Sequence, residues 1–373
     1  MRIDRGDIQR VNDSALKSRS PGIDAIKGIL ILAVLIGHNE ACSVHAPWLR
    51  QLLYYFHTQC FLFLACALDS APFSAALVRD RAVRYLVPYG MFGALATILS
   101  RSLASGAIKP AESWGTFGIA LLSGDEGLLR DAIGMRVFWF LPTLYTLVMF
   151  RAVASTSSMA GWLVMAASIA WMAAAGSIPS EAYRAVPLGL PVAFFFAASG
   201  LVAREIFRDE RNSGGREFLR AILAPIAAVG IGSLVVAMPL GSVNASQIST
   251  YYGAGLMTFM AGVLFPLAMF TMLMHQRDRF AGCDWLALIG RHSLAIYLVH
   301  MFVYRGATRL FFGSRFTDMH AVGGNLPLGL AILAVTGVVS LAVAIGIDRW
   351  PALRRIVFPR DCADWKKALG WNP

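Results

Sequence analysis

Three histidines lie inside apolar stretches of the sequence, where an ionisable side chain is costly and is usually retained for function. They are His38, His57 and His300. An imidazole can act as a general base near neutral pH, because its reference pKa is about 6.5 and burial disfavours its charged form. At about 1.5 Å per helical residue, all three lie at a similar depth, roughly 8–10 Å below one membrane surface. This coincidence predicts a shared polar cavity; the alternative is three structural histidines bonded to neighbouring helices.

A second group of residues has the spacing to bind an anion. Lys27 lies eleven residues before His38, and eleven steps of about 100° place both on one helix face, roughly 16 Å apart. Arg81 and Arg84 are three residues apart and also share a face, and paired guanidinium groups suit phosphates. The pattern predicts a phosphate-bearing ligand whose long reactive arm reaches His38. The alternative for the two arginines is ordinary positive charge on the cytoplasmic side.

Composition predicts where this chemistry takes place. The chain has 373 residues, of which 57% are hydrophobic and 15% charged, whereas a globular protein has roughly 25% charged residues. With a mean hydropathy of +0.59, this excludes an ordinary soluble enzyme and predicts a polytopic membrane protein. The net charge of +11 then indicates basic cytoplasmic loops and no nucleic-acid partner. The five cysteines form no C-x-x-C pair, so neither a disulfide framework nor a metal site is expected.

An all-α fold of about ten transmembrane helices is expected, because ten apolar stretches approach the roughly 20 residues that a spanning helix needs. These predicted spans are 24–43, 51–69, 85–104, 137–154, 159–177, 185–204, 219–238, 254–274, 285–304 and 326–347. The longest connection, 105–136, is expected to be mainly a solvated connector, with an amphipathic lid as the alternative.

The distribution of basic residues predicts the orientation. If the N-terminal tail is cytoplasmic, the tails and loops on that side hold 23 of the 33 Lys and Arg residues. The outer loops hold nine, and Lys27 lies inside the first predicted span. Both termini are therefore expected to face the cytoplasm. This divides the chain into a cytoplasmic tail over 1–20, a membrane domain over 21–350 and a second cytoplasmic tail over 351–373.

Five stretches of the sequence, in order along the chain, carry a family resemblance. They are Ile23-Asp24-Ala25-Ile26-Lys27-Gly28-Ile29 continuing to Val34-Leu35-Ile36-Gly37-His38, Phe56-His57 with Phe61-Leu62-Phe63-Leu64, Arg81-Ala82-Val83-Arg84, Trp139-Phe140-Leu141-Pro142, and Ile289-Gly290 leading to Ile296-Tyr297-Leu298-Val299-His300. Together they resemble the membrane acyltransferase 3 family, and the first is most similar to its fucose 4-O-acetylase-like branch.

The resemblance implies an enzyme of the bacterial inner membrane that transfers an acyl group, usually acetyl, from cytoplasmic acyl-CoA to a sugar hydroxyl of a cell-surface glycan or exopolysaccharide precursor. Acetyl-CoA would be the donor, and no cofactor would be tightly bound. The other expected partners are a lipid-linked or polymeric glycan, membrane lipids and other polysaccharide-assembly proteins.

We expect His38 to be the general base, His57 and His300 to orient the reactants, and Lys27, Arg81 and Arg84 to bind the CoA phosphates. The sequence leaves two alternatives open. One is a covalent acetyl-histidine at His38. The other is a transporter or flippase of lipid-linked sugars, which would also need about ten spans and a polar cavity.

Overall fold

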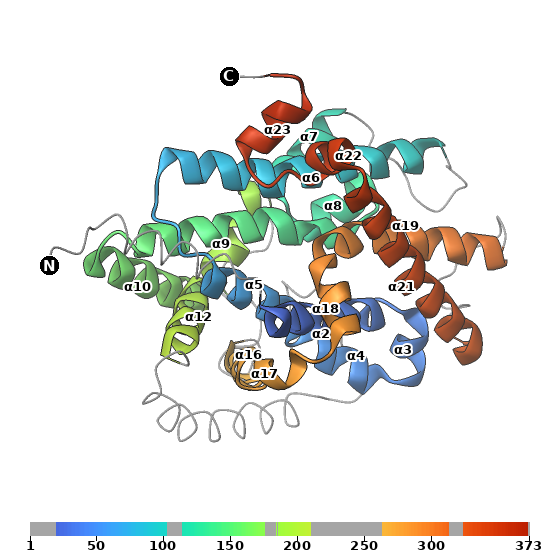
Figure 1. The fold of residues 1–373 in the computed structure, drawn as a ribbon, viewed down its shortest axis with the longest axis horizontal. Helices are drawn as coiled ribbons and strands as arrows, with labels where there is room; N and C mark the ends of the chain where they lie inside the picture. Colours follow the sequence, from blue (N-terminus) through green and yellow to red (C-terminus); the bar gives the residue numbers. More distant parts are fainter. Residues whose placement is uncertain are drawn as a thin grey trace, which may run out of the picture.

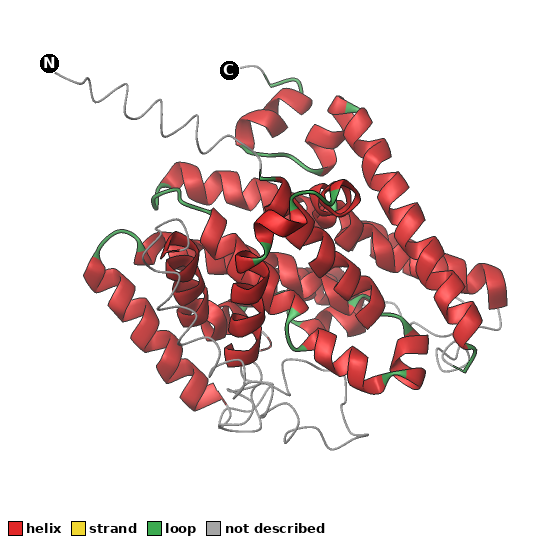
Figure 2. Cartoon of the chain, turned by 60° about the horizontal axis from the view of Figure 1, so that its bottom comes forward, coloured by secondary structure: helices red, strands yellow, loops and turns green. Residues whose placement is uncertain are grey.

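The computed structural model describes residues 20–102, 114–175, 184, 186–209, 263–312 and 324–371. In these ranges the chain forms α-helices and two short 3-10 helices, and no strand (Figures 1 and 2). In chain order the elements are α2 (Pro21–Gly37), α3 (Glu40–His45), α4 (Pro47–Tyr54), α5 (His57–Leu68), α6 (Ala75–Ser102), α7 (Trp114–Ser123), α8 (Glu126–Ile133), η1 (Arg136–Trp139), α9 (Phe140–Ala154), α10 (Ser158–Ala175), η2 (Pro187–Gly189), α12 (Leu190–Asp209), α16 (Phe265–His275), α17 (Arg277–Phe280), α18 (Asp284–Arg291), α19 (Ser293–Phe312), α21 (Leu326–Arg349), α22 (Pro351–Val357) and α23 (Cys362–Ala368).

Five helical segments among the described residues are long and apolar enough to cross a membrane. They are Pro47–Leu68, Ala75–Leu99, Arg136–Ala154, Pro187–Phe207 and Leu326–Arg349. The pair α18 and α19, bent by 76° at its break, would add a sixth as a broken span. These six correspond to six of the ten predicted spans. Of the other four, 159–177 gives α10, which is too short for a candidate span, and 254–274 is described only in part, as α16. The stretch 219–238 lies outside the described residues, and 24–43 is broken.

The first predicted span, 24–43, is not one continuous helix. α2 ends at Gly37, and His38 follows as its C-cap. Asn39 then begins α3, because its side-chain oxygen accepts hydrogen bonds from the backbone N–H groups of Ala41 and Cys42. An asparagine that caps a new helix in this way competes with continuation of the old one. The break therefore leaves His38 at the end of a helix.

α2 is central to the bundle and contacts α4, α5, α17, α18, α19 and α21, whereas α10 and α21 lie at opposite edges (Figure 1). Its closest approach is to α18. A Cβ atom added at Gly28 would overlap the Leu286 carbonyl, and one added at Gly290 would overlap the Asp24 carbonyl. Small residues at facing positions let two helix backbones touch in this way. The two glycines thereby set the position of α2 relative to α18.

The connection 105–136 contains two helices, α7 and α8, in its described part, so the expectation of a mainly solvated connector is wrong. Asp125 caps α8 by accepting from Leu128 N at 2.9 Å. Leu129 and Ile133, four residues apart on one face of α8, are both fully buried. These apolar side chains anchor the helix on the bundle.

The C-terminal segment after α21 also packs on the bundle. α22 and α23 both contact α6, and they lie beside it in Figure 1. The Cys362 N–H donates to Asp80 Oδ1 at 3.2 Å, and the ring of Phe358 lies 5.9 Å from that of Phe92. The segment 351–373 therefore contributes two packed helices to the described structure.

Candidate active site

The structure brings His38, His57 and His300 together, although 262 residues separate the first from the last. The centroid of the His38 ring lies 5.3 Å from that of His300 and 6.5 Å from that of His57. The Tyr54 ring closes the group, at 5.6 Å from His38 and 5.3 Å from His57. His38 ends α2, His57 begins α5 and His300 lies within α19. Three separate elements therefore converge on this histidine cluster.

Backbone hydrogen bonds set the protonation pattern of the cluster. Each histidine places Nδ1 against a carbonyl oxygen one turn away in the chain. The distances are 2.8 Å from His38 to Val34, 2.5 Å from His57 to Leu53 and 2.6 Å from His300 to Tyr297. A carbonyl oxygen only accepts hydrogen bonds, so Nδ1 carries the proton and the neutral ring keeps its lone pair on Nε2. All three rings thus hold the tautomer in which Nε2 can take up a proton.

The three histidines differ in access. His57 and His300 are each 1% exposed, whereas His38 is only partly buried. Nε2 of His300 is buried without a hydrogen-bond partner among the described residues. A buried acceptor of this kind is costly unless a ligand satisfies it. The cluster therefore offers an accessible base at His38 and an open acceptor at His300.

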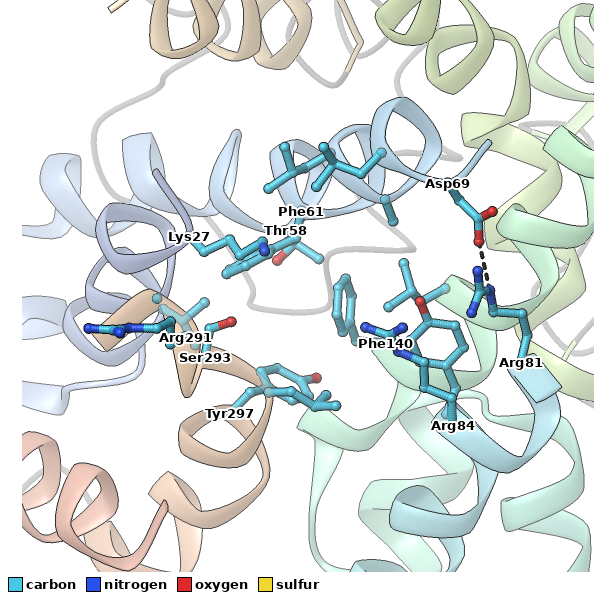
Figure 3. Close-up of a pocket in the computed structure, with 18 residues that line it drawn as sticks. Lys27, Thr58, Phe61, Asp69, Arg81, Arg84, Phe140, Arg291, Ser293 and Tyr297 are labelled. Atoms are coloured by element: carbon cyan, nitrogen blue, oxygen red, sulfur yellow. Dashed lines mark hydrogen bonds and ion pairs between the residues drawn. The ribbon is translucent and has the colours of Figure 1, made fainter. Parts of the chain in front are cut away.

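A cavity of about 440 Å³ begins one helical turn from the cluster, between α2, α5, α6, α9, α18 and α19 (Figure 3). Val34 and Tyr297, whose carbonyls hold His38 and His300, both line it, as does Phe61, four residues after His57. One turn corresponds to about 5.4 Å. The polar residues that line the cavity are Lys27, Thr58, Asp69, Arg81, Arg84, Tyr85, Arg291, Ser293 and Tyr297.

The cavity is strongly cationic, because four basic side chains and one carboxylate line it. Lys27 and Arg84 reach into it from opposite sides (Figure 3). Lys27 Nζ lies 3.2 Å from Asp24 Oδ1. The guanidinium of Arg84 lies over the Tyr85 ring at 5.8 Å. All three basic residues predicted to bind phosphates, Lys27, Arg81 and Arg84, thus line one cavity.

The break between α18 and α19 adds a further feature to the cavity wall. Gly290 and Arg291 end one helix, and Ser293 and Leu294 begin the next, and all four line the cavity. α19 has 20 residues, and its N-terminal end carries the positive part of the helix dipole. Broken helices that point such ends at a cavity are typical of anion sites inside membrane proteins.

Three charged residues near the site are missed by the sequence analysis. In the sequence, Arg151 and Arg291 are only two of the 23 basic residues assigned to the cytoplasmic side, and no function is predicted for Asp69. In the structure Arg151 is 1% exposed and pairs with Asp69 at 2.6 Å, while Arg291 lines the cavity. No pattern of spacing could have found Arg151, because its partner lies 82 residues away.

Glu126, the first residue of α8, is a buried carboxylate outside the candidate spans. It is 8% exposed, and Arg136 Nη1 lies 3.8 Å from its Oε1. Burial raises its pKa to about 7, against the opposing effect of Arg136. Its charge acts on Tyr54, next to His38, and on Tyr297, next to His300.

The described residues contain no group of three or more His, Cys, Asp or Glu side chains arranged to hold a metal ion.

Comparison with known proteins places this architecture in a family. Residues 20–347 match the family model Acyl_transf_3, described as an acyltransferase domain. No curated protein and no solved structure matches the chain significantly. The match covers most of the chain and includes every residue of the histidine cluster and the cationic cavity. The chain therefore belongs to the acyltransferase 3 family of integral membrane proteins.

Proposed function

We propose that the protein is an acyl-CoA-dependent O-acyltransferase that moves an acetyl group from cytoplasmic acetyl-CoA to a sugar hydroxyl of a cell-surface or exopolysaccharide precursor. The observation that carries the proposal is the proximity of the cationic cavity to the histidine cluster. Val34, Phe61 and Tyr297 line the cavity and lie one turn from the three imidazoles.

The cavity has the charge that a CoA donor requires. Lys27, Arg84 and Arg81 would bind its phosphates, because guanidinium and ammonium groups form strong charge-assisted hydrogen bonds with phosphate oxygens. Lys27 lies inside α2 and His38 follows its last residue, roughly 16 Å away by helical rise. That separation suits a donor whose thioester carbonyl stands at the end of a long, extended arm.

The chemistry proposed for His38 is general base catalysis. Its Nε2 takes the proton of the sugar hydroxyl while the oxygen attacks the thioester carbonyl. The tetrahedral intermediate then collapses and breaks the carbon–sulfur bond, and the imidazolium returns the proton to the departing CoA thiolate. His300 and His57 orient the reactants, His300 through an Nε2 acceptor without a partner among the described residues.

A two-step route through an acetyl group on His38 is the alternative mechanism. Acid quenching with labelled acetyl-CoA and no acceptor separates the two. Protein-bound label that is lost in His38→Ala indicates the covalent route, and its absence indicates direct transfer.

The proposed setting is a bacterial inner membrane with both termini and the cationic cavity on the cytoplasmic side, where acyl-CoA is available. Lipids, a lipid-linked or polymeric glycan and other polysaccharide-assembly proteins are the proposed partners. The basic residues that line the cavity support this orientation, since cytoplasmic segments are enriched in Lys and Arg.

A transporter or flippase of lipid-linked sugars is the second candidate. The 76° bend between α18 and α19 favours it, because broken helices near a polar cavity are a feature of transporters. One assay separates the two functions: thiol release from acetyl-CoA by the purified protein, with and without lipid-linked glycan from its host. Acceptor-stimulated release that His38→Ala abolishes supports the transferase. Absence of both release and CoA binding supports the transporter.

A further inference from the structure

Asp69 lies at the end of α5, where its backbone N–H donates to Ala65 O at 3.1 Å. Its carboxylate accepts from three donors. Oδ1 accepts from the Ala71 N–H at 3.1 Å and from Arg151 Nη2 at 2.6 Å. Oδ2 accepts from Arg81 Nε at 2.7 Å, the contact drawn in Figure 3. A carboxylate with three donors on a helix end is held in one orientation.

Arg151 is an unusual anchor for this carboxylate. Its side chain is 0% exposed, and Nε and Nη1 have no hydrogen-bond partner among the described residues. A buried charge is costly unless it is paired, and Asp69 supplies that pairing. The Asp69–Arg151 pair is therefore a rigid element at the cavity wall, since Asp69 cannot turn away without leaving the buried charge of Arg151 unpaired.

Of the two arginines that Asp69 contacts, Arg81 lines the cavity and Arg151 does not. Asp69 engages its Nε, and the two Nη groups make no hydrogen bond within the described residues. Both Nη groups thus stay available for a ligand, while the guanidinium plane is already oriented. Holding a flexible side chain in its binding orientation removes an entropic cost of about 0.5–1.5 kcal/mol from ligand binding.

We propose that Asp69, held by Arg151, is a positioning residue that aims Arg81 at the phosphates of the acyl donor. The inference rests on the proposed function and adds a residue to its donor site. Asp69 also lines the cavity, but its carboxylate oxygens are engaged by Arg81, Arg151 and a backbone amide, so its effect on the donor would pass through Arg81.

The direction in which Asp69→Asn changes the KM for acetyl-CoA distinguishes a positioning role from simple charge balance. A carboxylate that only lowers the local positive charge repels the anionic donor, so Asp69→Asn would then lower the KM for acetyl-CoA. A positioning carboxylate has the opposite effect. Loss of one well-oriented charge-assisted contact raises the KM about tenfold.

The assay compares acetyl-CoA with acetyl-pantetheine, which carries the same thioester but no phosphate. We expect Asp69→Asn to raise the KM for acetyl-CoA and leave that for acetyl-pantetheine unchanged. In an Arg81→Ala background, Asp69→Asn should have no further effect, because the two residues act as one unit. Asp131→Asn is the matched control: Asp131 pairs with Arg130 at 2.6 Å on the exposed surface, where such pairs contribute little.

If Asp69→Asn fails to fold because Arg151 is left unpaired, the double variant Asp69→Asn/Arg151→Met replaces it. That variant removes both buried charges and still frees Arg81. An equal rise in KM for both donors, an unchanged KM, or a lower KM for acetyl-CoA overturns the inference. If the wild-type protein transfers no acetyl group from acetyl-CoA, the proposed function fails; if it does and only the variant behaves otherwise, the inference alone fails.

Discussion

Replacing His38 by alanine should abolish catalysis while leaving the protein folded and able to bind CoA. The side chain makes one backbone hydrogen bond, to Val34 O at 2.8 Å, and the loss of such a bond costs about 1 kcal/mol of stability. A positioned general base contributes about 10²–10⁴-fold to the rate, equivalent to about 2.7–5.4 kcal/mol of activation free energy. The effect on kcat should therefore greatly exceed the effect on stability.

The assay is acceptor-dependent thiol release from acetyl-CoA, with CoA binding and thermal unfolding measured on the same preparations. Free imidazole should partly restore kcat in His38→Ala, because the variant leaves space between Tyr54 and His300, whose rings flank His38 at 5.6 and 5.3 Å. His57→Ala and His300→Ala serve as comparisons and should reduce kcat less. The reasoning is refuted if His38→Ala keeps kcat within about threefold of wild type, or if His300→Ala is the more severe variant and imidazole rescues that one.

Three further changes test other parts of the structure. Arg84→Gln should raise the KM for acetyl-CoA about tenfold through loss of a charge-assisted contact. Arg79→Gln is the control and should leave that KM unchanged, because the Arg79 side chain is 60% exposed and does not line the cavity. An equal effect of both substitutions would contradict the phosphate role of Arg84. Gly290→Ala should lower the unfolding temperature in detergent because its Cβ overlaps a backbone carbonyl of α2, whereas Gly306→Ala, with nothing within 4 Å, should be tolerated. Glu126 has a pKa of about 7 against an ordinary 4.5, so folding disfavours its charged form, and the wild type should lose stability as the pH rises from about 4.5 to about 7. Glu126→Gln should remove this loss and unfold at a higher temperature than the wild type at about pH 8. Unfolding temperatures that change with pH in the same way for both proteins would argue against a buried carboxylate.

The sequence determined the features that depend on residues close together in the chain. Lys27 and His38 share a face because eleven residues complete about three turns, and Asp24 pairs with Lys27 because they lie three residues apart. Hydropathy predicted the six described segments that are long and apolar enough to cross a membrane, since burial in lipid requires long apolar runs whatever their neighbours are. It also indicated a common depth for three histidines, because depth follows from distance to a helix end.

In two segments the average composition predicted the wrong local structure. The stretch 24–43 is apolar enough for one helix, but Asn39 caps α3 and ends α2 at Gly37. The connection 105–136 has the length of a solvated loop, but Leu129 and Ile133 bury one face of α8 in the bundle. In both cases contacts formed on folding outweigh the average tendency of the segment.

Only the tertiary structure decided which helices are neighbours and which charges meet. Lipid surrounds every spanning helix with the same apolar environment, so hydropathy along the chain does not encode lateral order. The contact of Asp69 with Arg151, the close approach of α2 to α18 at Gly290, and the meeting of His38 with His300 all depend on how the helices cross. These long-range contacts bring a cationic cavity and a histidine cluster close together, whereas the sequence alone presents them as separate polar residues in apolar stretches.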